Sequence, residues 1–195
     1  MQQTKIYIVH GYTAAPEHHW FPWLQKTLTT ERITVEVLAM PDSMSPDPEA
    51  WLTYMNDHVE QPDQHTFFVG HSLGCITILK YLERLDANAR VGGVIMVSGF
   101  GDPLSTLPEL DRFVHQPVDY KKLITGISER IVIAAEDDAI VPIVYSERFA
   151  QCLQAELHRM EKGGHFLDRD GYVEFPLVRD LLLNMVESAS ARRTS

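Results

Sequence analysis

The stretch FFVGHSLGC, residues 67–75, decides the fold of this chain. An apolar run typical of a strand ends at Gly70, and a segment with helical spacing begins after Ser72. Glycines two residues either side of a serine are typical of a sharp strand-to-helix turn, where side chains at those positions would collide. The pattern predicts that the Ser72 hydroxyl projects above the sheet as a nucleophile. A tight structural turn is the alternative interpretation.

Short apolar runs rich in β-branched residues recur on both sides of this turn. They predict six strands, at 5–9, 34–39, 66–70, 93–98, 130–135 and 156–160. Helical spacing predicts helices after Ser72 and at 49–59, 142–154 and 173–188, with Pro142 and Pro176 in first turns. Strands that alternate with helices predict a three-layer α/β fold, with a mostly parallel sheet of about six strands and helices on both faces.

The length of 195 residues favours one domain. We expect this domain to span residues 1–188 and to be followed by a flexible tail at 189–195. The longest irregular segment, residues 99–128, contains prolines, a glycine pair and one predicted short helix near 119–125. It is too long for a simple connection, so it is either a functional loop that partly covers a site or a surface excursion, and the compact length of the chain predicts no large cap domain.

The composition limits the classes of partner. The chain has 17 basic and 27 acidic residues, a net charge of −10, which argues against nucleic acid or an anionic membrane surface as a partner. The N-terminal sequence is not typical of a signal peptide, and no apolar run is long enough to span a bilayer. We expect a cytoplasmic protein with free thiols at Cys75 and Cys152, and a single disulfide between them is the alternative.

A nucleophilic serine needs a base, and the base needs an acid that orients it. The loops after the fifth and sixth predicted strands contain acids at Asp137 and Asp138 and a histidine, His165, after two glycines. Because the carboxyl ends of parallel strands meet at one edge of a sheet, these loops should lie near Ser72. We therefore predict Ser72 as nucleophile, His165 as base and Asp138 as acid, with Asp137 as the alternative acid.

Backbone N–H groups beside the serine are the candidate donors to an oxyanion. Leu73 starts the helix after Ser72, and Tyr12 lies in the loop after the first predicted strand, where Gly11 would allow a close approach. The chain has no metal-ligand spacing at His18 or elsewhere, so neither a metal nor a cofactor is predicted.

Five residues are candidates for the substrate pocket, on the basis of their position near the predicted nucleophile. They are His10, Gly11, Trp20, His71 and Phe100. Two of these assignments have alternatives. Trp20 could pack in the core against the sheet, and His71 could pack or hydrogen-bond locally.

The motifs VHGY (9–12), MPD (40–42), GHSLG (70–74), DDAIVP (137–142) and GGHF (163–166) occur in this order, together with a tryptophan at position 51. With them the chain resembles the α/β-hydrolases, and more narrowly the small serine hydrolases grouped with retinoblastoma-binding protein 9 and the bacterial YdeN proteins. The resemblance covers roughly residues 5–186 and implies catalysis by Ser72, Asp138 and His165. The retinoblastoma name refers to binding of pocket proteins through an L-x-C-x-E motif. LGCIT at 73–77 departs from that motif at its last position, so such binding is not expected of this chain.

The residues and the resemblance together predict a serine hydrolase that acts on a small molecule. The expected reaction is cleavage of a small to medium carboxylic ester, thioester or small amide through an acyl-enzyme on Ser72, with esters preferred. The sequence does not fix the oligomeric state. The alternative is a protein-binding module on the same fold with little or no catalytic activity.

Overall fold

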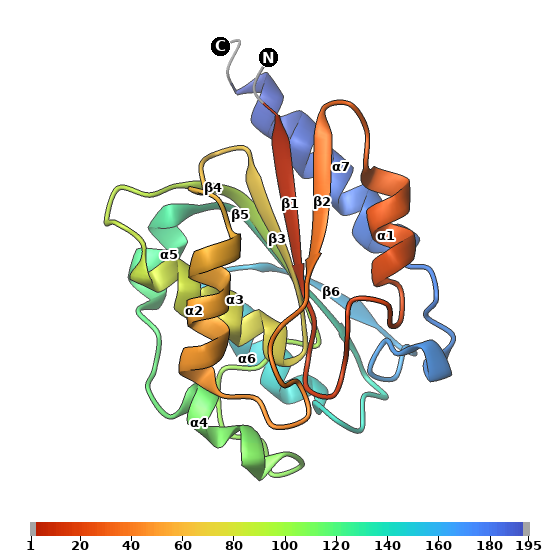
Figure 1. Ribbon diagram of the computed structural model, residues 1–195. Helices are drawn as coiled ribbons and strands as arrows, with labels where there is room; N and C mark the ends of the chain where they lie inside the picture. The colour runs from red at the N-terminus through yellow and green to blue at the C-terminus, as the bar shows by residue number, and fades with distance from the viewer. Residues whose placement is uncertain (1–2, 193–195) are drawn as a thin grey trace.

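The computed structural model describes residues 3–192, and its fold is a six-stranded sheet with helices on both faces (Figure 1). The strands are β1 (Thr4–Val9), β2 (Ile33–Leu38), β3 (Thr66–His71), β4 (Val91–Val97), β5 (Ile127–Ala135) and β6 (Glu156–Met160). They lie in the order β2-β1-β3-β4-β5-β6, and all five neighbouring pairs are parallel. The predicted three-layer α/β architecture is confirmed.

The helices divide between the two faces of the sheet (Figure 1). One face carries α2 (Pro48–His58), α3 (Leu73–Arg84), α5 (Tyr120–Gly126) and α6 (Ile143–Leu153), with the short α4 (Asp111–Val114) packed against α3. The other face carries α1 (Phe21–Leu28) and α7 (Pro176–Ala191). Within residues 3–192, no helix combines the length and the apolar character that a membrane span requires.

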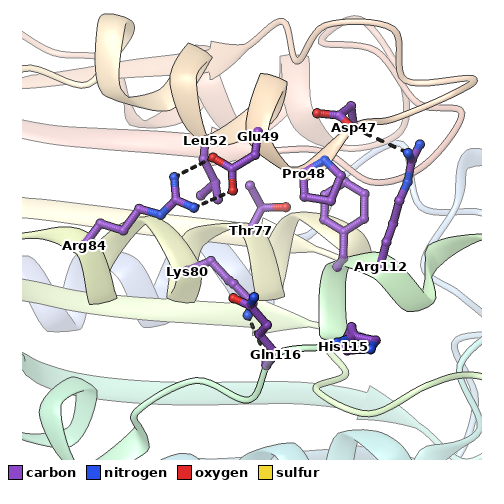
Figure 2. A pocket seen from close by; sticks show the side chains of 11 residues that line it. Asp47, Pro48, Glu49, Leu52, Thr77, Lys80, Arg84, Arg112, His115 and Gln116 are labelled. Carbon is purple, nitrogen blue, oxygen red and sulfur yellow. Dashed lines mark hydrogen bonds and ion pairs between the residues drawn. The ribbon is translucent and has the colours of Figure 1, made fainter.

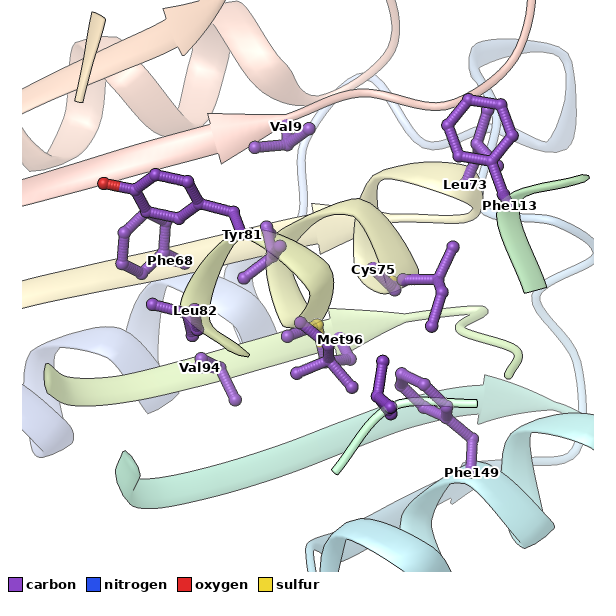
Figure 3. Close-up of a cluster of buried hydrophobic side chains, with 14 of the residues drawn as sticks. Val9, Phe68, Leu73, Cys75, Tyr81, Leu82, Val94, Met96, Phe113 and Phe149 are labelled. Atoms are coloured by element: carbon purple, nitrogen blue, oxygen red, sulfur yellow. The ribbon is translucent and has the colours of Figure 1, made fainter. Parts of the chain in front are cut away.

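The central strands β3 and β4 are buried along their whole length, because helices cover both of their faces. Figure 3 shows the core on the α3 side, where Cys75 and Tyr81 of the helix pack over Phe68 and Met96 of the sheet. Burial raises the pKa of the Cys75 thiol, which therefore stays protonated as a small core side chain. Cys152 is exposed, and both cysteines are free, as expected.

Most strand and helix boundaries lie within three residues of the sequence predictions, and three helices show the differences that matter here. Helix α1 was not predicted, because its eight residues begin with an aromatic–proline pair and are too few to show a clear period. Pro142 is the residue before α6 instead of lying in its first turn. Helix α7 begins at Pro176, three residues after the predicted start at 173, and continues to Ala191, three residues beyond the expected end of the domain. The last residues of the expected tail, 193–195, lie outside the described residues.

The long segment between β4 and β5 is packed onto the domain. It contains a 3₁₀ turn, η1 (Pro108–Leu110), then α4 and α5, and α5 matches the short helix predicted near 119–125. The side chains of Leu104, Leu110 and Phe113 are buried in the core. The segment therefore belongs to the main domain and forms no large cap.

Candidate active site

Ser72 lies between β3 and α3, at the carboxyl edge of the sheet (Figure 1). Its backbone angles, φ 53° and ψ −118°, lie outside the regions that residues with side chains normally occupy. Its N–H donates to the carbonyl of Val97 at 2.9 Å, which ties the turn to β4. The turn that the glycine pattern predicts is present, and its backbone is strained at the serine itself.

The glycines around Ser72 are required by close backbone contacts. A Cβ on Gly74 would lie 2.1 Å from the carbonyl oxygen of Val9, and one on Gly70 would lie 2.8 Å from a backbone atom of α3. A Cβ on Gly11 would lie 3.0 Å from the Cβ of Ser72. Three segments therefore meet closely at Ser72, namely the loop after β1, the end of β3 and the start of α3. Only glycine fits at the contact positions of these segments.

Replacing Gly74 with alanine is expected to destabilise the fold by about 3 kcal/mol or more, because the new methyl group meets a backbone carbonyl that has no rotamer to change. Urea unfolding followed by circular dichroism measures the effect. Gly126→Ala is the matched control, since its Cβ would have only one neighbour, a carbonyl oxygen at 3.4 Å. Equal stability of the two variants would contradict the contact at Gly74.

The side chains of Asp138 and His165 meet between the loops that follow β5 and β6. The Nδ1 of His165 lies 2.8 Å from Oδ2 of Asp138, and both side chains are buried. The hydroxyl of Ser98 donates to the same oxygen at 2.8 Å, while the N–H groups of Ile140 and Val141 donate to Oδ1 at 2.9 Å each. An ionised carboxylate only accepts hydrogen bonds, so Nδ1 of His165 carries its proton and Nε2 is the acceptor nitrogen.

Asp137, the alternative acid, contacts a different part of the same loop. Its Oδ1 accepts the N–H groups of Gly164 and Gly163, both at 2.8 Å. The hydrogen bonds from these two N–H groups lower the pKa of the exposed Asp137 carboxyl, and the bond from Gly164 has the larger effect. Of the two neighbouring aspartates, Asp138 is the one that contacts the His165 side chain, and Asp137 holds the backbone that precedes it.

Sequence reasoning missed two residues at this site. Ser98 follows β4, is fully buried and has a positive φ of 49°. Its only sequence signal is a polar residue at the carboxyl end of a central strand. Asp170 lies in the 3₁₀ turn η2 (Asp168–Asp170), and its Oδ2 accepts the N–H groups of His165 and Leu167 at 3.0 and 3.1 Å. A surface aspartate in a polar loop gives no signal of this kind.

Ser72 and His165 line one cavity of about 520 Å³ at the carboxyl edge of the sheet. Loops after β1, β5 and β6 form its walls, and the segment after β4 adds Thr106 and Leu107. The Thr106 hydroxyl donates to the carbonyl of Ile140 at 2.7 Å, which joins two of these walls. The segment 99–128 therefore forms part of the cavity, and its closure over a ligand stays a prediction.

The predicted pocket and oxyanion residues fall into two groups. Gly11, Tyr12 and His71 line the cavity, and Leu73 follows Ser72 directly as the first residue of α3. The first N–H groups of a helix have no partner within it, so the Leu73 N–H has no acceptor inside α3. The remaining three pocket candidates do not line the cavity and are buried in the core: His10, Trp20 and Phe100.

Hydrogen bonds to backbone groups explain why two of these candidates, His10 and Trp20, can lie inside the protein. The Nδ1 of His10 donates to the carbonyl of Gly11 at 2.9 Å, and its Nε2 accepts the N–H of Met40 at 3.2 Å. The indole N–H of Trp20 donates to the carbonyl of Phe166 at 3.1 Å. Their polar atoms are thus satisfied by backbone groups, which allows both rings to be buried.

Several histidines surround the cavity, and burial lowers the pKa of three of them: His10, His19 and His71. For His71 the neighbouring His165 adds to this effect, and the pKa falls well below the ordinary value. The ring of His71 lies 5.8 Å from that of His19 and 5.0 Å from that of His165. These imidazoles therefore stay neutral in the folded protein over a range in which exposed histidines are protonated.

The free energy of unfolding is therefore expected to fall as the pH drops below about 6.5. In that range the unfolded chain binds protons on histidines such as His71 that the folded chain leaves neutral, and each contributes a slope of up to about 1.4 kcal/mol per pH unit. Urea unfolding at pH 7.5 and 5.5 measures it, with His115→Gln at an exposed position as the control. If the free energy of unfolding of His71→Gln depends on pH as steeply as that of the wild type, His71 is not a source of the pH dependence.

A second cavity, of about 410 Å³, lies between α2, α3 and α4 (Figure 2). Its charged side chains are engaged with one another or with the backbone. Figure 2 shows Arg84 in a two-pronged ion pair with Glu49, at 2.6 and 3.0 Å, and Lys80 donating to the carbonyl of Gln116. The hydroxyl of Thr77, which also lines the cavity, donates within α3 to the carbonyl of Leu73. No nucleophile–base pair lines this cavity, so the cavity at Ser72 is the candidate active site.

Residues 3–192 contain no group of three or more histidine, cysteine, aspartate or glutamate side chains arranged to hold a metal ion.

Comparisons with known proteins identify the family of this chain. The family described as "Serine hydrolase" matches residues 6–184. The chain is 41% identical to the protein YdeN of Bacillus subtilis over 178 residues, 91% of this chain and 94% of YdeN, and 27% identical to serine hydrolase RBBP9 of Rattus norvegicus over 92% of this chain and 96% of that protein.

The crystal structure of the ydeN gene product from B. subtilis superimposes with a TM-score of 0.92 at 40% identity, and the match covers 95% of this chain and 100% of that one. The α/β-hydrolase fold and the predicted likeness to YdeN and retinoblastoma-binding protein 9 are confirmed. The chain belongs to the serine hydrolase family.

Proposed function

We propose that this hydrolase cleaves carboxylic esters with small to medium acyl groups, and related thioesters or small amides, through an acyl-enzyme on Ser72. The observation that carries the proposal is the buried contact between Asp138 and His165, at 2.8 Å, beside a cavity that His165 shares with the strained Ser72. The proposal assigns Ser72, His165 and Asp138, which come from three separate turns at one sheet edge, the roles of nucleophile, base and orienting acid.

In the proposed reaction, Ser72 Oγ attacks the substrate carbonyl carbon as Nε2 of His165 takes its proton. Asp138 holds the Nδ1 proton and stabilises the imidazolium that forms. The backbone N–H groups of Leu73 and Tyr12 bind the oxyanion. When the intermediate collapses, the imidazolium protonates the leaving alcohol. Water then attacks the acyl-enzyme by the same route and releases the acid and free Ser72.

The cavity supports the choice of substrate size. Its volume of about 520 Å³ is in the range of sites for small molecules. Leu107, Ile140 and Leu167 supply apolar walls suited to an acyl chain. Esters are preferred over amides because an alkoxide leaves the tetrahedral intermediate more readily than the anion of an amine does, so an ester depends less on protonation of its leaving group.

Labelling with a fluorophosphonate probe tests the proposal without knowledge of the natural substrate. The folded protein is expected to be labelled once per chain and the heat-denatured protein not at all, after which a series of p-nitrophenyl esters from acetate to decanoate defines the acyl preference. Absence of labelling and of ester hydrolysis in the folded protein would reject the proposal and favour a binding role for this fold.

A further inference from the structure

We propose that His71 is a positioning residue, which holds the loop that carries His165 in place against the nucleophile. This inference rests on the proposed function, because it assigns His71 to the same reaction. The contact joins two points far apart in the sequence. The Nε2 of His71 donates to the backbone carbonyl of His165 at 2.8 Å, and His71 immediately precedes Ser72 at the end of β3.

The loop needs such support because its backbone is not in a relaxed conformation. Residues 163–167, here called the base loop, contain two positive φ angles, 53° at Gly164 and 55° at Phe166, one on each side of His165. A positive φ at phenylalanine is costly and persists only where the surroundings hold it. The orientation of the His165 ring therefore depends on contacts from outside the base loop.

Four side chains supply these contacts, and their roles differ. The indole N–H of Trp20 donates to the carbonyl of Phe166. Asp137 accepts the N–H groups of Gly163 and Gly164, and Asp170 accepts that of His165. Both aspartates therefore hold N–H groups of the base loop. His71 instead binds a carbonyl group of the base loop, since it donates to the carbonyl of His165 itself. It is also the anchor that comes from the nucleophile's own strand, so it sets the base loop relative to Ser72.

A neutral histidine suits this position. The side chain is buried, with 2% of its surface exposed, and its Nδ1 has no hydrogen-bond partner among the described residues. The proton therefore lies on Nε2, where the carbonyl requires it. Burial and the nearby His165 lower its pKa, so it donates this hydrogen bond without placing a second positive charge 5.0 Å from the ring that becomes charged in the reaction.

Aromatic packing fixes the direction of the His71 ring. The rings of Trp20 and Phe21 contact it edge-on, with centroids 6.0 and 5.8 Å away. A phenylalanine can occupy this space and keep the packing while losing the N–H donor. A glutamine can place an amide N–H near the position of Nε2. The pair His71→Phe and His71→Gln therefore separates the hydrogen bond from the packing.

The test measures the rate constant of inactivation and the apparent binding constant of a fluorophosphonate probe for both variants, with kcat and KM for p-nitrophenyl acetate and the thermal midpoint. In His71→Phe the inactivation rate constant and kcat are expected to fall about 10- to 100-fold, the loss typical of a small misplacement of a catalytic group, while probe binding and KM change little. His71→Gln is expected to recover the rate to within about threefold of the wild type.

A folded His71→Phe protein that reacts at the wild-type rate would overturn the inference, and so would a His71→Gln protein that is as slow as His71→Phe. If the phenylalanine variant does not fold, His71→Asn replaces it, because its shorter amide does not reach the carbonyl, and the same contrast with glutamine decides. Wild-type protein that is not labelled at all would reject the proposed function, and this inference with it. If only the positioning role is wrong, the wild type is labelled by the probe and the His71 variants react at the same rate as the wild type.

Discussion

Ser72→Ala is expected to lose all fluorophosphonate labelling and to hydrolyse p-nitrophenyl acetate at least about 10⁴-fold more slowly than the wild type. The substitution removes the single oxygen that forms the acyl-enzyme and leaves the rest of the site in place. Its fold should be retained, because the turn is held by backbone contacts, including the Ser72 N–H bond to Val97, that alanine also makes.

Ser146→Ala is the matched control for this experiment. Ser146 is buried like Ser72, but its hydroxyl donates to the carbonyl of Gly99 at 2.8 Å, and it does not line the Ser72 cavity. We expect this variant to lose about 1 kcal/mol of stability and to keep its labelling and its activity. Labelling that persists in Ser72→Ala would place the nucleophile at another residue and remove the basis of the proposed mechanism.

The turn at Ser72 could be predicted from sequence because its physical constraint is local. Glycines two residues before and after a serine indicate a backbone that is crowded by its own strand and helix. The strand and helix patterns on either side are also strong. The structure adds the long-range reason, which is that Gly74 packs against the carbonyl of Val9 in β1. The position of the acid and the histidine near Ser72 could be expected because the loops after parallel strands meet at one edge of the sheet.

Other features of the site depend on contacts that leave no local pattern. The hydrogen bond from Ser98 to Asp138 spans 40 residues, and that from His71 to His165 spans 94. The sequence could not decide whether Trp20 lines the pocket or packs in the core, because aromatic side chains do both. In the structure Trp20 is buried in the core. Sequence also could not separate Asp137 from Asp138, since adjacent residues of one type differ only in the direction that the folded loop gives them.

Asp138→Asn is expected to lower kcat for p-nitrophenyl acetate by about 10³- to 10⁴-fold. The asparagine oxygen can keep the Oδ1 contacts with the N–H groups of Ile140 and Val141, which turns its NH₂ group toward Nδ1 of His165. Nδ1 must then accept a hydrogen bond, so the proton moves to Nε2 and the nitrogen that faces the reaction loses its lone pair. The variant should remain folded, because its shape and its two backbone bonds are unchanged.

Asp137→Asn is the control that separates the two aspartates. Its amide oxygen can still accept the N–H groups of Gly163 and Gly164, so the base loop keeps its anchor and kcat should fall less than about tenfold. The contrast between neighbouring, chemically identical substitutions is informative because expression, charge change and overall stability are closely matched. Comparable losses in both variants would mean that the carboxylates act by holding the base loop, and a larger loss in Asp137→Asn would transfer the role of the acid to Asp137.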